Sequence, residues 1–214
     1  MTELIESLKP KNKRNQRYIL VLAPSDDVVE LLAETVMSEG LAEGMKITAR
    51  QLEKIKTADQ LERCRQRAWN LLAHRPRTRD ELHTALRQRK FRAAICDQVI
   101  ERLEELGYLD DQAFAKMFTE QAKMSSKNGP RMVYQKLRQK GVEEVTASRS
   151  ADQLREGKHQ EESARQLLEK WNRRSKPEDP LKRKQAAAGY LMRRGFDPEL
   201  VWETVRQVLG EQDN

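Results

Sequence analysis

The feature that most constrains the fold of this chain is an internal repeat. Three similar ten-residue segments, each with a central leucine and an apolar last residue, occupy residues 82–91, 133–142 and 187–196. Their central leucines, Leu86, Leu137 and Leu191, lie 51 and 54 residues apart. A period of this length predicts tandem copies of one supersecondary unit, in which neighbouring copies help to bury each other's apolar faces.

The start of each repeated segment carries a helix-capping signal. Thr78 and Glu81 fit a capping box, Pro130 occupies a first helical position, and Asp179 precedes Pro180 in the same way. The third start lies about one helical turn further from its leucine than the first two. We therefore expect the second helix of the third repeat to be longer by a turn.

The end of each segment also follows a pattern. Gly141 and Gly195 stand where a helix is commonly followed by a residue with left-handed backbone, and Lys90 occupies the equivalent place in the first repeat. A residue with a Cβ adopts that conformation only at a cost. The first repeat must therefore make this turn differently or tolerate some strain.

Apolar residues at helical spacing predict one further helix before and one after each segment. Asp197 and Pro198 mark the start of the last of these, and the third helix of the middle repeat has only a thin apolar face. The prediction is an all-α fold of nine helices, in three tandem helix-turn-helix-like bundles that form an elongated curved array. The repeats are placed at residues 58–109, 110–157 and 158–214.

Residues 1–57 form an N-terminal extension of different character. A basic segment is followed by residues 18–22 and 28–32, whose composition indicates the two strands of a β-hairpin. A helix over residues 27–37 fits the second of these about equally well. Thr48 then caps a short helix. An isolated hairpin is only marginally stable in water, so the extension must pack against another element.

Composition excludes several classes of protein. The 214 residues contain no run of about 20 apolar residues and no secretory signal, which predicts a cytoplasmic protein without a membrane span. Two cysteines are too few for a disulfide framework and have no zinc-like spacing to histidines. We interpret Cys96 as a packed core side chain and Cys64 as a surface thiol.

No catalytic motif stands out in the chain. The phosphate-loop, dinucleotide-binding, zinc-protease and nucleophile-elbow patterns are absent from the sequence. Asp110 and Asp111 resemble a metal-binding pair, but their place between two helices favours capping of the second helix. The sequence thus predicts a protein that is not an enzyme and uses no cofactor and no metal. Four aromatic side chains at apolar-face spacing are assigned to the core rather than to base stacking: Trp69, Phe114, Phe118 and Trp171.

The distribution of charge is more informative than the formal net charge of +7. The second helix of every repeat lies in an acid-free stretch rich in Lys and Arg, whereas acids gather on the third helices. Repeats stacked in one orientation would align these bases. We call this set the basic stripe, and it consists of Arg87, Arg89, Lys90, Lys127, Arg131, Lys136, Arg138, Lys140, Lys182, Arg183, Lys184, Arg193 and Arg194.

Part of the basic stripe has a simpler explanation. Cations at helix C-termini interact favourably with the helix dipole, by about 0.3 to 1 kcal/mol each. That explanation does not cover Lys127, Arg131 and residues 182–184, which lie near helix starts. We therefore favour a surface that binds anions, which could contact phosphates without reading base sequence.

Four segments carry a set of motifs in a fixed order. They are L-x-x-L-G-Y-L-D-D-x-x-F-A at residues 103–115, Gly129-Pro130, L-x-x-K-G-V at 137–142, and Y-L-x-R-R-G-F at 190–196. The set resembles the RecX family, whose members regulate the bacterial recombinase RecA. The resemblance covers about residues 61–209, and the chain departs from the family at Lys90, where a glycine is frequent.

The resemblance implies tandem three-helix repeats and a function that composition could not show. That function is binding of RecA, chiefly as a filament on single-stranded DNA, and modulation, most often inhibition, of its ATPase, strand-exchange and co-protease activities. It implies no catalytic residue. We expect a monomer that binds RecA through the basic stripe, with weak non-specific DNA binding besides. The alternative is a DNA-binding protein that affects recombination indirectly.

Overall fold

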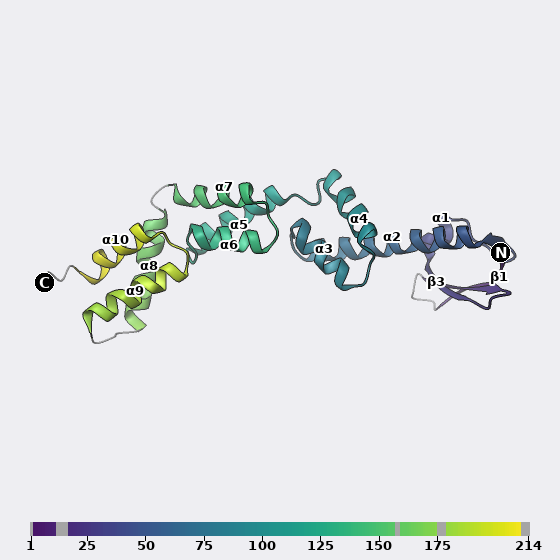
Figure 1. Ribbon diagram of the computed structural model, residues 1–214, viewed down its shortest axis with the longest axis horizontal. Coiled ribbons are helices and arrows are strands. Elements are labelled where there is room, and N and C mark those ends of the chain that lie inside the picture. Colours follow the sequence, from purple (N-terminus) through teal and green to yellow (C-terminus); the bar gives the residue numbers. More distant parts are fainter. Residues whose placement is uncertain (1, 12–16, 157–158, 175–178, 211–214) are drawn as a thin grey trace. The chain divides into compact units, whose positions relative to one another are not determined.

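The computed structural model describes residues 2–11, 17–156, 159–174 and 179–210 (Figure 1). The chain divides into two compact units, of which unit 1 comprises residues 1–76 and 82–108 and unit 2 comprises residues 77–81 and 109–214. Residues 12–16 of the predicted basic segment lie outside the described part. Within the described ranges, no helix has the length and apolar character needed to cross a membrane.

Unit 1 begins with a four-stranded antiparallel sheet in the order β3-β2-β1-β4. The strands are β1 (Thr2–Pro10), β2 (Arg17–Ala23), β3 (Val28–Leu32) and β4 (Lys46–Thr48). The predicted hairpin is therefore confirmed as β2 and β3, but the sequence did not indicate β1 or β4. The helical alternative for residues 27–37 is wrong for its first half and right for its second, because α1 (Ala33–Ser38) directly follows β3.

A single long helix, α2 (Ala49–His74), packs against the sheet with its first half and forms the first helix of the first repeat with its second half. Thr48 begins it with a full capping box, in which its side chain accepts from the amide of Gln51 and the Gln51 side chain accepts from the amide of Thr48. Leu52 and Ile55 of this helix share a buried cluster with the apolar residues of the sheet. The boundary expected between residues 57 and 58 lies inside α2.

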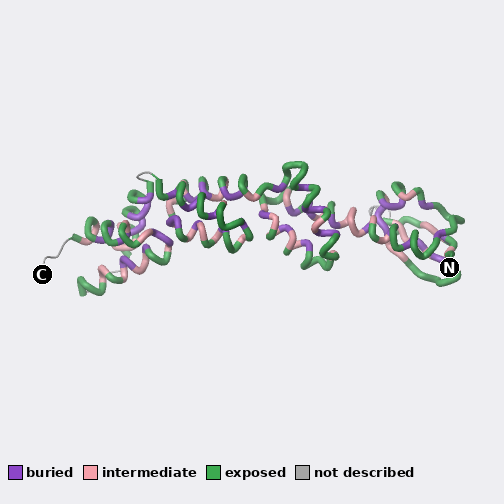
Figure 2. Tube along the Cα trace, turned by 45° about the horizontal axis from the view of Figure 1, so that its top comes forward, coloured by how far each residue is buried: buried purple, intermediate pink, exposed green. Residues whose placement is uncertain are grey.

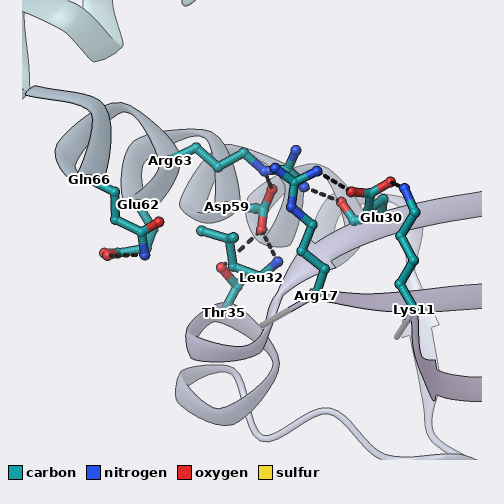
Figure 3. Close-up of polar contacts among 9 residues, drawn as sticks. All are labelled: Lys11, Arg17, Glu30, Leu32, Thr35, Asp59, Glu62, Arg63 and Gln66. Atoms are coloured by element: carbon teal, nitrogen blue, oxygen red, sulfur yellow. Dashed lines mark hydrogen bonds and ion pairs between the residues drawn. The ribbon is translucent and has the colours of Figure 1, made fainter. Parts of the chain in front are cut away.

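A buried carboxylate fixes the sheet to α2 (Figure 3). Asp59 accepts hydrogen bonds from the amide of Leu32 and the hydroxyl of Thr35, and forms an ion pair with Arg63 one turn along the helix. Arg63 also donates to the carbonyl oxygen of Glu30 on the edge strand β3. These contacts satisfy backbone groups at the sheet edge, which would otherwise lack partners.

The carboxylate of Glu30 links the two ends of the β1–β2 connection. It forms ion pairs with Lys11 at 2.6 Å and with Arg17 at 2.5 Å (Figure 3). Hydrogen bonds from these two cations lower the pKa of Glu30 below its ordinary value, against a smaller opposing effect of burial.

The three repeats contain nine helices among the described residues, as predicted. The first repeat consists of α2, α3 (Arg79–Gln88) and α4 (Ala93–Glu105), the second of α5 (Asp111–Ser125), α6 (Pro130–Gln139) and α7 (Glu144–Arg155), and the third of α8 (His159–Arg174), α9 (Pro180–Arg193) and α10 (Pro198–Leu209). With 14 residues against 10 in α3 and in α6, α9 has the expected extra turn.

The repeat leucines occupy the centres of these bundles. Leu86, Leu137 and Leu191 are all completely buried. Figure 2 shows the same pattern along the helices, where buried positions alternate with exposed ones at helical spacing. The thin apolar face predicted for the third helix of the middle repeat is present, since α7 buries Ala147, Ser150, Ala151 and Leu154.

Asp110 caps the helix that follows it, as the sequence indicated, whereas Asp111 binds the start of α3, which the sequence did not indicate. The Asp110 carboxylate accepts from the amides of Gln112 and Ala113 and thereby caps α5. Asp111 accepts from the amide of Arg79, and burial raises the pKa of Asp111. Within the described residues, no group of three or more His, Cys, Asp or Glu side chains is placed to hold a metal ion.

Two side-chain predictions in the first repeat are wrong. Cys64 is not a surface thiol, because it is fully buried on α2, as is Cys96 on α4. Its sequence neighbours are charged, but on a helix they point in other directions. Trp69 was assigned to the core and is 36% exposed, with its ring packed edge-on against Tyr108 at 4.4 Å between centroids.

Candidate interaction surface

All three repeats make the same turn after their second helix. Lys90, Gly141 and Gly195 have φ angles of +66°, +84° and +84°. The amide of each donates to the carbonyl oxygen three residues earlier, in Arg87, Arg138 and Met192 respectively. The first repeat therefore does not change the turn, and Lys90 tolerates the left-handed conformation.

Two of these turns also lie against another helix start. A Cβ on Gly195 would lie 2.2 Å from the amide nitrogen of Met132, and a Cβ on Gly141 would lie 2.2 Å from Cβ of Asp80. Glycine is thus required at both places for close approach as well as for its φ angle. Lys90 is exposed, and its side chain extends into solvent.

We call these two contacts the joints. In the first joint, residues 78–81 meet residues 140–141, and the Thr78 hydroxyl donates to the carbonyl of Lys140. In the second joint, residues 129–132 meet residues 194–195, and the amide of Gly129 donates to the carbonyl of Arg194 at 2.8 Å. Residues 77–81 belong to unit 2, so both joints lie within that unit. The two are built alike, because Lys140 and Arg194 hold equivalent places in their repeats.

Several members of the basic stripe are engaged at the joints. Lys140 forms an ion pair with Glu81 at 2.5 Å, and its ammonium lies 5.8 Å from the ring centroid of Phe114. Arg194 donates to the carbonyl of Lys127 and lies 4.7 Å from the ring centroid of Tyr190. Both cations therefore stabilise the packing of unit 2 in addition to carrying charge.

The second joint also explains a cation at a helix start. Arg131 forms an ion pair with Asp197 at 3.0 Å, and Arg155 pairs with the other oxygen of the same carboxylate at 3.1 Å. Asp197 occupies the N-cap position of α10 but makes no side-chain capping bond there. The position predicted for Asp197 is correct, whereas its predicted capping role is replaced by a bridge between two arginines.

Four further members of the basic stripe make contacts near their own helices. Arg87 and Arg138 donate to the carbonyls of Phe91 and Val142, just past the ends of α3 and α6. With these two bonds, Arg87 and Arg138 play the helix-end role that the sequence predicts for part of the basic stripe. The Lys136 ammonium donates to Asn128 at 3.4 Å, and Arg183 donates to the side chain of Asn172.

The remaining cations have no ion pair with any described residue. This group consists of Arg89, Lys90, Lys127, Lys182, Lys184 and Arg193, and all except the half-buried Lys184 are exposed. Four other cations of unit 2 lie outside the acid-free stretches of the sequence and were therefore not predicted: Arg155, Lys170, Arg173 and Arg174. Acids lie close to each of these in the sequence, and their position beside the basic stripe follows only from helix packing.

The fold and its joints define a class of protein built from consecutive three-helix domains. Sequence models of the first, second and third three-helix domains of RecX match residues 64–103, 110–149 and 159–205 in that order. This chain belongs to the RecX family of regulatory proteins.

Individual relatives agree with this assignment. Regulatory protein RecX of Streptomyces coelicolor is 34% identical over 72% of this chain and 81% of its own length. Regulatory protein RecX of Halalkalibacterium halodurans is 27% identical over 98% of this chain and 80% of its own length.

Solved RecX structures share the fold. A crystal structure of regulatory protein RecX covers 96% of this chain and 99% of its own, with a TM-score of 0.70 and 24% identity. The crystal structure of RecX from Lactobacillus salivarius covers 71% of this chain and 97% of its own, with a TM-score of 0.62 and 22% identity.

Proposed function

We propose that this protein binds RecA recombinase, chiefly as the filament on single-stranded DNA, and inhibits the filament's ATPase, strand-exchange and co-protease activities. The observation that carries this proposal is the succession of three RecX three-helix domains along one chain. In this proposal the protein acts by binding RecA, as a monomer in the cytoplasm, and is not an enzyme.

The basic stripe is the surface that we assign to this contact. Some of its side chains stabilise the joints, others make contacts near their own helices, and the rest have no ion pair with any described residue. Lys127 and Arg193 are exposed members of the last group and lie next to residues of the second joint. They can therefore bind an anionic partner without disturbing the fold.

The function is tested by RecA's DNA-dependent ATPase. Addition of this protein should inhibit ATP hydrolysis by RecA on single-stranded DNA. Replacing Lys127→Glu together with Arg193→Glu should weaken the inhibition, because like charges would then face the anionic partner. Reversal of Arg131 or Arg138 would be a poorer test, since both side chains make internal contacts.

A matched control keeps the total charge change constant. Lys116→Glu with Arg149→Glu alters two exposed cations of unit 2 outside the basic stripe. Inhibition should survive in this control. Absence of any effect of the unmodified protein on RecA would contradict the proposed function, and equal inhibition by all variants would contradict the role of the basic stripe.

A further inference from the structure

The third repeat begins its second helix differently from the other two. The residues that precede α3 and α6, Thr78 and Gly129, are buried in the joints. In contrast, α9 begins about one turn earlier, and its first turn is exposed, with Leu181 66% exposed. The start of the second helix is thus buried in a joint in two repeats and exposed in the third. We call this exposed start of α9 the open end.

A side-chain contact fixes the geometry of this open end. Arg183 in the first turn of α9 donates to Asn172 in the last turn of α8. The contact holds together the neighbouring cations of both helices, which lie side by side in the bundle of Figure 1. We call this group the cationic end, and it consists of Lys170, Arg173, Arg174, Lys182, Arg183 and Lys184.

The described acids nearest to the cationic end form no ion pair with it. Asp179 accepts from the amides of Leu181 and Lys182, so its carboxylate serves as the cap of α9. The carboxylate of Glu169 lies 3.9 Å from Arg165, and both residues line one pocket together with Arg173. Among the residues that the structure describes, no ion pair connects the cationic end to a carboxylate. Six cations close together repel one another, and a bound polyanion would relieve that repulsion.

The exposed face of α9 extends from the cationic end towards the second joint. Lys182 and Arg193 are eleven residues apart, which places them on the same side of the helix. Gly189, between them, presents no side chain. The helix has 14 residues and is about 20 Å long, so its exposed face can contact several successive phosphates of one strand.

We propose that the cationic end and the exposed face of α9 bind the phosphodiester backbone of single-stranded DNA directly. The inference rests on the proposed function for the choice of single-stranded DNA, since that is the nucleic acid inside a RecA filament. Unpaired cations at both ends of a helix suit a ligand with evenly spaced charges. Binding of this kind depends on salt and not on base sequence.

The test is binding of a labelled oligothymidylate of about 20 nucleotides, measured by fluorescence anisotropy without RecA between about 50 and 200 mM salt. The variant Arg173→Gln with Arg174→Gln and Lys182→Gln removes three exposed charges. Its affinity should fall by on the order of tenfold or more, and the slope of log affinity against log salt should decrease by about 2.

The control triple Lys54→Gln, Lys116→Gln and Arg149→Gln loses the same charge from exposed positions elsewhere. It should keep both the affinity and the slope. If both triples weaken binding equally, or if neither does, the inference is overturned. This result is independent of the RecA assay, because a protein that binds DNA at α9 but leaves RecA's ATPase unchanged would contradict only the proposed function.

Discussion

The amide of Gly129 donates a 2.8 Å hydrogen bond to the carbonyl oxygen of Arg194 and so attaches the start of α6 to the end of α9. The adjacent Gly195 permits this contact, because any Cβ there would lie 2.2 Å from the amide nitrogen of Met132. The glycine at the end of a repeat's second helix therefore belongs to the packing between repeats as well as to the turn itself.

Gly195→Ala should destabilise unit 2. The substitution adds left-handed strain of about 1 to 2 kcal/mol and a collision with backbone that costs about 1 to 3 kcal/mol more. Gly141→Ala should also destabilise unit 2, because its added Cβ would lie 2.2 Å from Cβ of Asp80, an atom that moves only with the backbone. Urea unfolding measures both, and Gly107→Ala is a control at another helix end with positive φ but open space around it. Equal losses at Gly195 and Gly107 would contradict the joint.

Lys90→Gly should stabilise the protein, in contrast to the glycine substitutions. Lys90 adopts a φ of +66° and is exposed, so glycine removes strain without removing packing. The gain is partly offset by the greater freedom of glycine in the unfolded chain, which leaves roughly 0.5 kcal/mol of net stabilisation. A lower unfolding midpoint for this variant in urea would show that the lysine side chain contributes contacts of its own.

Asp59→Asn should detach the sheet from α2. The change leaves Arg63 without its buried partner and weakens the bonds to Leu32 and Thr35, at a cost of about 3 kcal/mol. Amide hydrogen exchange at Leu32 should accelerate. The control is Glu62→Gln on the same helix, whose carboxylate accepts from Gln66 (Figure 3) and also pairs with Arg65. Unchanged exchange in Asp59→Asn would rule out the anchoring role.

The ion pairs of Glu30 should stabilise the protein at neutral pH, and this stabilisation should be lost in acid. Because Lys11 and Arg17 lower its pKa in the folded state, the ion pairs stabilise the protein above the ordinary pKa of 4.5. That stabilisation disappears as the pH falls through the lowered value. At pH 7, Glu30→Gln should cost about 0.5 to 1 kcal/mol, and the difference from the unmodified protein should vanish in acid. A difference that persists in acid would mean that charge is not its cause.

The two buried cysteines should resist thiol reagents in the native protein. Burial, with a further contribution from Cys96, raises the pKa of the Cys64 thiol to about 12, and burial also raises the pKa of Cys96. The thiolate is the reactive form, so at pH 8 labelling should proceed through unfolding and accelerate in urea. Fast labelling in native buffer would show that the α2–α4 interface opens readily.

Some of this architecture can be read from the sequence, and the reason is local. The spacing of Leu86, Leu137 and Leu191 and the residues at the helix starts depend on periodicity and capping, which act within a few residues. The same local rules located Lys90, Gly141 and Gly195 at the ends of the second helices.

The rest depends on contacts between residues far apart in the chain. Cys64 lies between two arginines in sequence, and only the packing of α4 buries it. The role of Asp197 follows from Arg131, which is 66 residues away. Strand β1 was not indicated, because its charged and apolar residues acquire a pattern only beside β2. The cationic end likewise appears only when α8 and α9 pack together.

Recognition of the RecA filament by this protein is best tested by co-sedimentation. The full-length chain is mixed with RecA and single-stranded DNA in the presence of ATP, and parallel samples omit RecA or DNA. We expect the protein to sediment with the complete filament, far more than with DNA alone at the same salt concentration. Sedimentation that is the same with and without RecA would contradict this expectation.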